Sequence, residues 1–249
     1  MGILIRVKNA SFENKAVAFV PPVADGLEYL NFFSGGAANV ARNLAPNKPS
    51  GVLFGSPVYN EHSAVFTSQA AYVGTSVEDA PEMTMIAVAR AVADSAAHII
   101  SSFSGPRPGG VAGTSYGKTM WFTNPTNGDG WVQIQTVQGR WDGIAGSAAL
   151  NTISGTLPIN VNQWVAATGL MGVNTNQMRN NSSGFVDTDA TQLQPDPTSM
   201  KLRIGSATIS SGSAEIAFAA VYSRLLTDTE VDAVYAFIKA YYARRGIAI

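Results

Sequence analysis

Three side chains on one predicted strand have the arrangement that sugar recognition requires. In the segment Trp131–Thr136, the alternation of a strand puts Trp131, Gln133 and Gln135 on one face and the aliphatic residues between them on the other. An indole ring offers a flat apolar surface, and two amides offer donors and acceptors to hydroxyl groups. We therefore predict a saccharide-binding platform on this face.

Further candidate ligand groups follow on what we expect to be the next loop, and they are Arg140, Trp141 and Asp142. The alternative interpretation is that Trp131 closes the edge of the core and that the two glutamines are simply solvated. The pattern of residues does not choose between the two, because both put polar groups on the outside of a strand.

Glycoside hydrolysis with retention needs two carboxyl groups about 5 Å apart. The closest grouping is Glu78, Asp79 and Glu82. Neighbouring residues of a strand point to opposite faces, and Pro81 interrupts the run. We interpret these three acids as part of a solvated loop, so a glycan hydrolase is the least favoured function.

The other residue types that do chemistry are few. The two histidines, His62 and His98, are not spaced as a pair of metal ligands; we expect His98 in a strand with a satisfied hydrogen bond and His62 in a turn. The run Gly117-Lys118-Thr119 lacks the glycine that a phosphate-binding loop would have at Ala112. The absence of cysteine excludes disulfides, thiolate metal sites and a cysteine nucleophile.

Calcium is the one inorganic ligand with candidate residues. Asn127–Gly130 and Asp187–Asp189 are rich in oxygen, with Asp129, Asp187 and Asp189 as the carboxylates. A calcium ion needs six or more oxygen ligands, and all these residues are also ordinary turn formers. We favour the turn interpretation and expect no cofactor.

Charge and hydropathy exclude two classes of partner. The chain of 249 residues has a formal net charge of −1, and only 13% of its residues are charged, about half of the usual 25%. Nucleic acid is not expected as a partner, since phosphate binding needs an excess of Lys and Arg. No apolar run approaches the ~20 residues of a membrane helix. The N-terminal residues lack the apolar core of a signal peptide, which favours synthesis in the cytoplasm.

Most of the chain consists of short β-like runs between Gly, Pro, Asn and Ser residues, which is typical of a sandwich or barrel. In Met83–Val92 both alternating faces are apolar, so we predict a central strand covered on both sides. The other predicted strands are Leu27–Phe33, Ser63–Thr67, Tyr72–Val77, His98–Phe103, Lys118–Thr123, Trp131–Gln138, Trp164–Met171, Met200–Gly205 and Glu215–Tyr222.

One segment is helical by pattern. Thr227 and Glu230 have the spacing of a capping box, and an apolar stripe follows at helical spacing. We predict a helix over 228–245 that packs on a sheet. Residues 1–23, with a possible strand at Ile3–Val7, are predicted to be an N-terminal arm, and residues 24–249 a single domain.

Several segments, in this order, resemble the laminin-G-like, concanavalin A-like lectin jelly rolls. The opening Asp25-Gly26-Leu27-Glu28-Tyr29 resembles their "DGLVAYW", and Gln163-Trp164-Val165 resembles "QWxHVA". The most specific segment is 215–231, which resembles the closing "GxIAEVxIYDRALSDEEI". The remaining matches are Ser63–Phe66 with Tyr72-Val73, Met83–Arg90 and Leu202–Gly205. The sequence departs from the pattern at Thr67, where the family has Asp, and at Ser223, again in place of Asp.

The resemblance implies an all-β fold: an antiparallel two-sheet jelly roll with one C-terminal helix. The family includes sugar binders, adhesion modules, enzyme accessory domains and bacteriophage tail or capsid proteins. Low charge, the missing signal peptide and the single-domain layout favour a non-enzymatic phage virion protein that binds host-cell glycans. Its partners would be other virion subunits in a symmetric homo-oligomer. The alternatives are a free-standing lectin and, less favoured, a glycan hydrolase.

Overall fold

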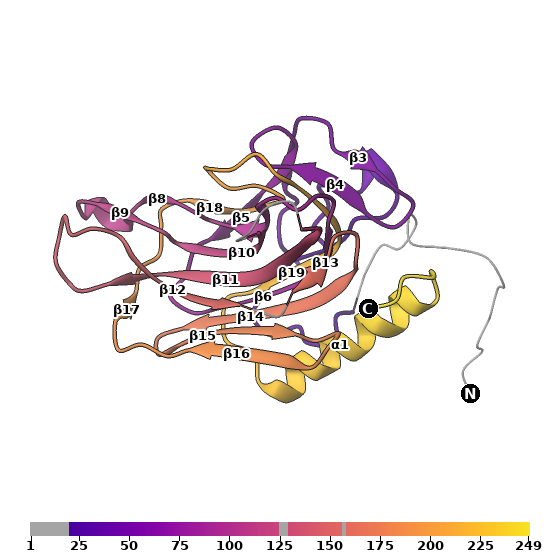
Figure 1. The fold of residues 1–249 in the computed structure, drawn as a ribbon. Helices are drawn as coiled ribbons and strands as arrows, with labels where there is room; N and C mark the ends of the chain where they lie inside the picture. The colour runs from indigo at the N-terminus through magenta and orange to yellow at the C-terminus, as the bar shows by residue number, and fades with distance from the viewer. Residues whose placement is uncertain (1–19, 125–128, 156–157) are drawn as a thin grey trace.

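The computed structural model describes residues 20–124, 129–155 and 158–249, and it shows the predicted fold: two large antiparallel sheets and one C-terminal helix (Figure 1). The predicted strand at Ile3–Val7 lies outside the described residues. Figure 1 shows the helix lying along the outside of one sheet, next to the strands β14, β15 and β16.

The sheet that carries the helix, here the helix-side sheet, has the order β16-β15-β14-β6-β19-β4-β3, and β1 also pairs with β19. Its strands are β16 Phe185–Asp189, β15 Thr175–Asn180, β14 Val165–Gly172, β6 Met83–Ala91, β19 Ser213–Tyr222, β4 Ala64–Thr67, β3 Val58–Tyr59 and β1 Leu27–Phe32.

The second sheet, here the open sheet, has the order β12-β11-β10-β7-β18-β5-β2, and β13 and β17 pair with β11. Its strands are β12 Leu150–Gly155, β11 Trp131–Trp141, β10 Lys118–Thr123, β7 Ala97–Ser101, β18 Lys201–Ile204, β5 Tyr72–Glu78, β2 Val52–Phe54, β13 Ile159–Asn160 and β17 Gln194–Pro195. A separate short ladder joins β8 Gly105–Pro106 to β9 Thr114–Ser115.

Strand β6 shows how its sequence specifies a central position. It pairs with β14 on one side and β19 on the other. Met83 and Met85 contribute to the core between the two sheets, whereas Ile86 and Val88 contribute to a second core beneath the helix. Burying each such side chain stabilises the fold by about 1.5–3 kcal/mol. The prediction of a strand covered on both sides is confirmed.

Helix α1 spans Asp228–Ala243, and Thr227 with Glu230 forms the predicted capping box. The buried residues Val231, Val234, Ile238 and Tyr242 face the helix-side sheet. The Tyr242 hydroxyl donates to the Ala217 carbonyl of β19 at 2.6 Å, which joins the end of the helix to the sheet. The helix ends two residues earlier than predicted, since Arg244 is the C-cap and Gly246 adopts a left-handed φ of 72°.

Candidate functional site

On β11, the side chains of the predicted platform alternate between the core and the outside as the sequence predicts. Val132 and Ile134 are fully buried between the sheets, whereas Trp131, Gln133 and Gln135 are half-buried on the outer side of the open sheet. The Gln135 amide donates to the Gln133 carbonyl oxygen at 3.1 Å. Helix α1 does not cover this side, because its buried face packs against the other sheet.

The prediction that Arg140 lies on a loop and contacts a ligand is wrong. Arg140 belongs to β11 and is completely buried. Its guanidinium donates to the carbonyls of Gly172, Val173 and Thr175 at 2.9, 3.0 and 3.2 Å. These carbonyls belong to β14, β15 and the turn between them, so Arg140 joins the open sheet to the helix-side sheet.

Trp141 and Asp142 stand at the far end of β11, six and seven residues from Gln135, or roughly 20 Å at the rise of a strand. The Trp141 ring covers the Arg107 guanidinium at 5.3 Å. Asp142 is exposed and accepts from the Ile144 backbone N–H at 2.9 Å, which lowers the pKa of its carboxyl. The structure therefore separates these two residues from the platform rather than joining them to it.

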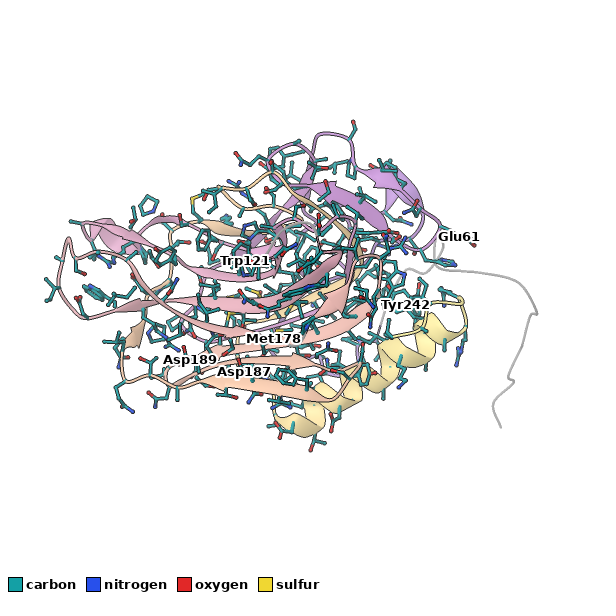
Figure 2. All side chains as sticks on the ribbon, viewed as in Figure 1. Glu61, Trp121, Met178, Asp187, Asp189 and Tyr242 are labelled. Carbon is teal, nitrogen blue, oxygen red and sulfur yellow. The ribbon has the colours of Figure 1, made fainter. Side chains whose placement is uncertain are left out.

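Next to the two glutamines, the open sheet carries four rings in a continuous stack, which we call the ring stack: Trp121, His98, Phe103 and Tyr116. Successive ring centroids are 5.3, 5.9 and 5.3 Å apart, with interplanar angles of 22°, 29° and 29°. Trp121 pairs with Gln135 across the β10–β11 ladder and with His98 across the β10–β7 ladder. Figure 2 shows Trp121 on the open sheet, away from Tyr242 of the helix.

His98 is buried in the middle of the ring stack, at 1% exposure. As predicted, it lies in a strand and makes a hydrogen bond, which joins Nδ1 and the Thr119 hydroxyl at 2.9 Å. Burial lowers the pKa of His98 to about 4, so the ring is neutral near pH 7. Among the described residues, His98 Nε2 and Trp121 Nε1 have no hydrogen-bond partner.

On the other side of the ring stack, Arg203 on β18 pairs with Ser101 of β7 and with Gly74 of β5. The Arg203 guanidinium lies 5.2 Å from the centre of the Tyr72 ring, and Tyr72 stacks on Phe54 at 4.7 Å and 13°. Rings, amides and the cations Arg203 and Lys201 therefore extend across the open sheet from β11 to β2.

The prediction that Glu78, Asp79 and Glu82 belong to a solvated loop is wrong for two of them, because Glu78 belongs to β5 and Asp79 is buried. The side chains of Asp79 and Lys118 are both completely buried and form an ion pair at 3.1 Å. Ser102 Oγ and Thr198 N also donate to Asp79, at 2.8 and 3.0 Å. Burial lowers the pKa of Lys118 and the Asp79 charge opposes that effect. This Lys118 pair has a structural role, which agrees with the rejection of a phosphate-binding loop.

The calcium candidates make hydrogen bonds within the fold, and the turn interpretation is wrong for Asp187 and Asp189, which lie on strand β16. Asp187 and Asp189 on β16 accept from the backbone N–H groups of Gly155 and Ile153 at 2.9 and 3.3 Å, so they connect the edge strand of one sheet to the edge strand of the other (Figure 2). Asp129 accepts from the Trp131 N–H at 3.4 Å, as in a turn. Within the described ranges, no three His, Cys, Asp or Glu side chains are grouped as metal ligands.

Comparison with known proteins shows the fold alone. The binding domain of botulinum neurotoxin DC in complex with SialylT matches with a TM-score of 0.55 and 10% identity, over 86% of this chain and 52% of that one. The botulinum neurotoxin serotype D ligand-binding domain in complex with N-acetylneuraminic acid gives the same values. Trypanosoma rangeli sialidase matches with a TM-score of 0.54 and 10% identity, over 84% of this chain and 32% of that one.

This chain thus spans about half of the toxin fragments and a third of the sialidase. No protein-family model matches the sequence, and no curated protein matches it either. In the part of the chain that the structure describes, no helix combines the length and apolar character that a membrane span requires.

The sequence did not predict the ring stack, nor the cluster that Arg203 forms with Tyr72 and Phe54. His98 lies on β7, Phe103 follows that strand, and Tyr116 lies between β9 and β10. Only the tertiary fold brings these rings into one stack with Trp121 of β10. Arg203 did carry a signal. It stands between Leu202 and Ile204, which are both fully buried, so alternation alone points it outward.

Proposed function

We propose that this domain is a non-enzymatic glycan-binding module and that the glycan lies on the outer face of the open sheet. One observation carries the proposal: the ring stack and the amides of Gln133 and Gln135 lie side by side on the outer face of the open sheet, which α1 does not cover. Sugars present both apolar C–H faces and hydroxyl groups, so a site for them combines ring surfaces with donors and acceptors.

The polar groups of this face match hydroxyl chemistry. Each glutamine amide offers two donors and an acceptor. A hydroxyl group both donates and accepts, so it can pair with either kind of atom.

The structural neighbours support the same class of ligand, since two of them are described in complex with sialylated or sialic acid ligands. The similarity to a sialidase does not extend to a catalytic proposal. The buried carboxylates Asp79 and Asp196 are held in ion pairs by Lys118 and Arg107, whereas glycoside hydrolysis needs a pair of carboxyls that face the sugar.

The experiment is a glycan array read with the whole chain, followed by affinity measurement on the best ligand. Gln135→Ala and Trp131→Ala remove an amide and a ring from the proposed face, and each is expected to weaken binding by about tenfold. Gln177→Ala is the matched control, because Gln177 is a half-buried glutamine on β15 of the helix-side sheet. Absence of any bound glycan, or an equal loss in Gln177→Ala, would contradict the proposal.

We further propose that the module acts as a subunit of a phage virion, as a symmetric homo-oligomer that presents this face to the host cell. The low share of charged residues supports this context, because a surface partly covered in an assembly needs little charge. Light scattering coupled to size exclusion tests it: a stable trimer or larger oligomer is expected, and a monomer at micromolar concentration would contradict it.

A further inference from the structure

Beside the ring stack, the open sheet has a groove of about 270 Å³, whose walls are Phe54 of β2 and Arg203 of β18. Gly74 of β5 forms part of its floor. A Cβ at Gly74 would lie 3.0 Å from the Phe54 ring, so the absence of a side chain there lets the ring lie low over the strand. Phe54 is 45% exposed in spite of its size, which leaves an aromatic surface open to solvent.

The positive charge of Arg203 in this groove is not neutralised by a protein carboxylate. Arg203 forms no ion pair among the described residues, and its guanidinium makes one long hydrogen bond, from Nη1 to the Ala207 carbonyl at 3.4 Å. A guanidinium has five N–H donors, so most of them remain for a ligand. Lys201, at the same groove, differs because it is paired with Glu78 at 3.4 Å.

The Arg203 donors are also held in position. The guanidinium lies over the Tyr72 ring, and the opposite contact of Tyr72 is the stacked Phe54 ring. A fork of donors fixed by packing loses little conformational freedom when it binds, and its planar geometry matches a carboxylate in a bidentate manner.

We infer that this groove recognises the carboxylate of an acidic sugar, with Arg203 binding the anion and Phe54 contacting the sugar ring. The inference rests on the proposed function and specifies its ligand class. Charge complementarity decides between acidic and neutral sugars: a neutral sugar would leave the Arg203 donors without an ionic partner in a site built from rings.

The test compares an acidic trisaccharide, sialyllactose, with its neutral counterpart, lactose, by calorimetry on the whole chain. Wild type is expected to bind the acidic sugar at least tenfold more tightly, with an affinity that falls as salt is raised. Arg203→Gln should abolish that preference. Arg203→Lys, which keeps the charge but not the fork, should lose about threefold to tenfold. Lys201→Gln is the matched control and should lose about twofold or less.

The possible outcomes separate this inference from the proposed function. Equal binding of lactose and sialyllactose would overturn the inference and leave glycan binding intact. A preference for sialyllactose that survives in a folded Arg203→Gln variant would also overturn it. If Arg203→Gln does not fold, Arg203→Lys decides: an affinity for sialyllactose equal to that of wild type would overturn the inference. Binding of inorganic sulfate as tight as that of sialyllactose would show that the groove recognises the anion alone. Failure of wild type to bind any glycan would defeat both proposals.

Discussion

His98, at the centre of the ring stack, predicts a specific dependence of stability on pH. Burial lowers the pKa of His98 from 6.5 to about 4 in the folded chain. The unfolded chain therefore takes up a proton between these values while the folded chain does not. The contribution of His98 to the free energy of unfolding is therefore fully present above about pH 6.5 and is lost as the pH falls toward 4.

The size of this loss of stability follows from the pKa shift of His98. One pKa unit corresponds to about 1.4 kcal/mol, so the whole shift corresponds to roughly 3 kcal/mol. About 2 kcal/mol of it is lost between pH 7 and pH 5. Glu230, whose pKa is lowered to about 2 chiefly by its hydrogen bond from Arg224, acts at lower pH and does not overlap with this window.

The variant His98→Phe isolates the effect, because phenylalanine keeps a ring between Trp121 and Phe103 but cannot titrate. Urea unfolding at pH 7 and pH 5 should show that wild type loses about 2 kcal/mol more than His98→Phe.

The same prediction can be read directly by NMR, since the chain has two histidine rings to assign. The His98 ring signals should not titrate between pH 7 and pH 5. A titration midpoint near 6, or equal stability losses in wild type and His98→Phe, would refute the argument that this ring is buried inside the stack.

Two further substitutions test the packing that supports the face. Asp79→Ala would leave Lys118 buried without its carboxylate, so the free energy of unfolding in urea is expected to fall by about 3–5 kcal/mol. The double variant Asp79→Leu with Lys118→Met should recover most of this loss. If it does not, the unpaired charge of Lys118 is not the cause of the loss. Tyr242→Phe removes the 2.6 Å hydrogen bond to Ala217 and should lower the free energy of unfolding by about 1 kcal/mol; an unchanged value would show that α1 is held by apolar packing alone.

The strands that sequence predicted are those with an apolar face of their own. Strands such as β6 and β19 were located to within one or two residues at either end. The strands missed lie at the sheet edges or, like β15, next to an edge strand. β15 has Met178 as its one apolar residue, and β12 and β16 consist largely of polar residues. An edge strand takes its place from the ladder of its neighbour and needs little apolar area, so its own composition predicts no strand.

The errors at charged residues have a related cause. Asp79 lies next to Glu78 and near Glu82, a local pattern typical of a solvated loop, but its partner Lys118 is 39 residues away in sequence. Arg140 similarly takes its acceptors from the turn between β14 and β15. Buried charge depends on partners that only the tertiary fold supplies, so local sequence patterns assign such residues to the surface.

The two sheets are unequal on their outer faces, and the sequence encodes that inequality. The helix-side strand β6 is apolar on both faces, because one face must meet the other sheet and the second must meet α1. On the open sheet, β11 is apolar at Val132 and Ile134 but carries Trp131, Gln133 and Gln135 on its outer face. If that outer face were only a solvated surface, charged side chains would suffice there. Besides the Lys201–Glu78 pair, the outer face of the open sheet carries rings, amides and Arg203. The proposed contact with a ligand that has both apolar and hydroxyl groups requires this combination.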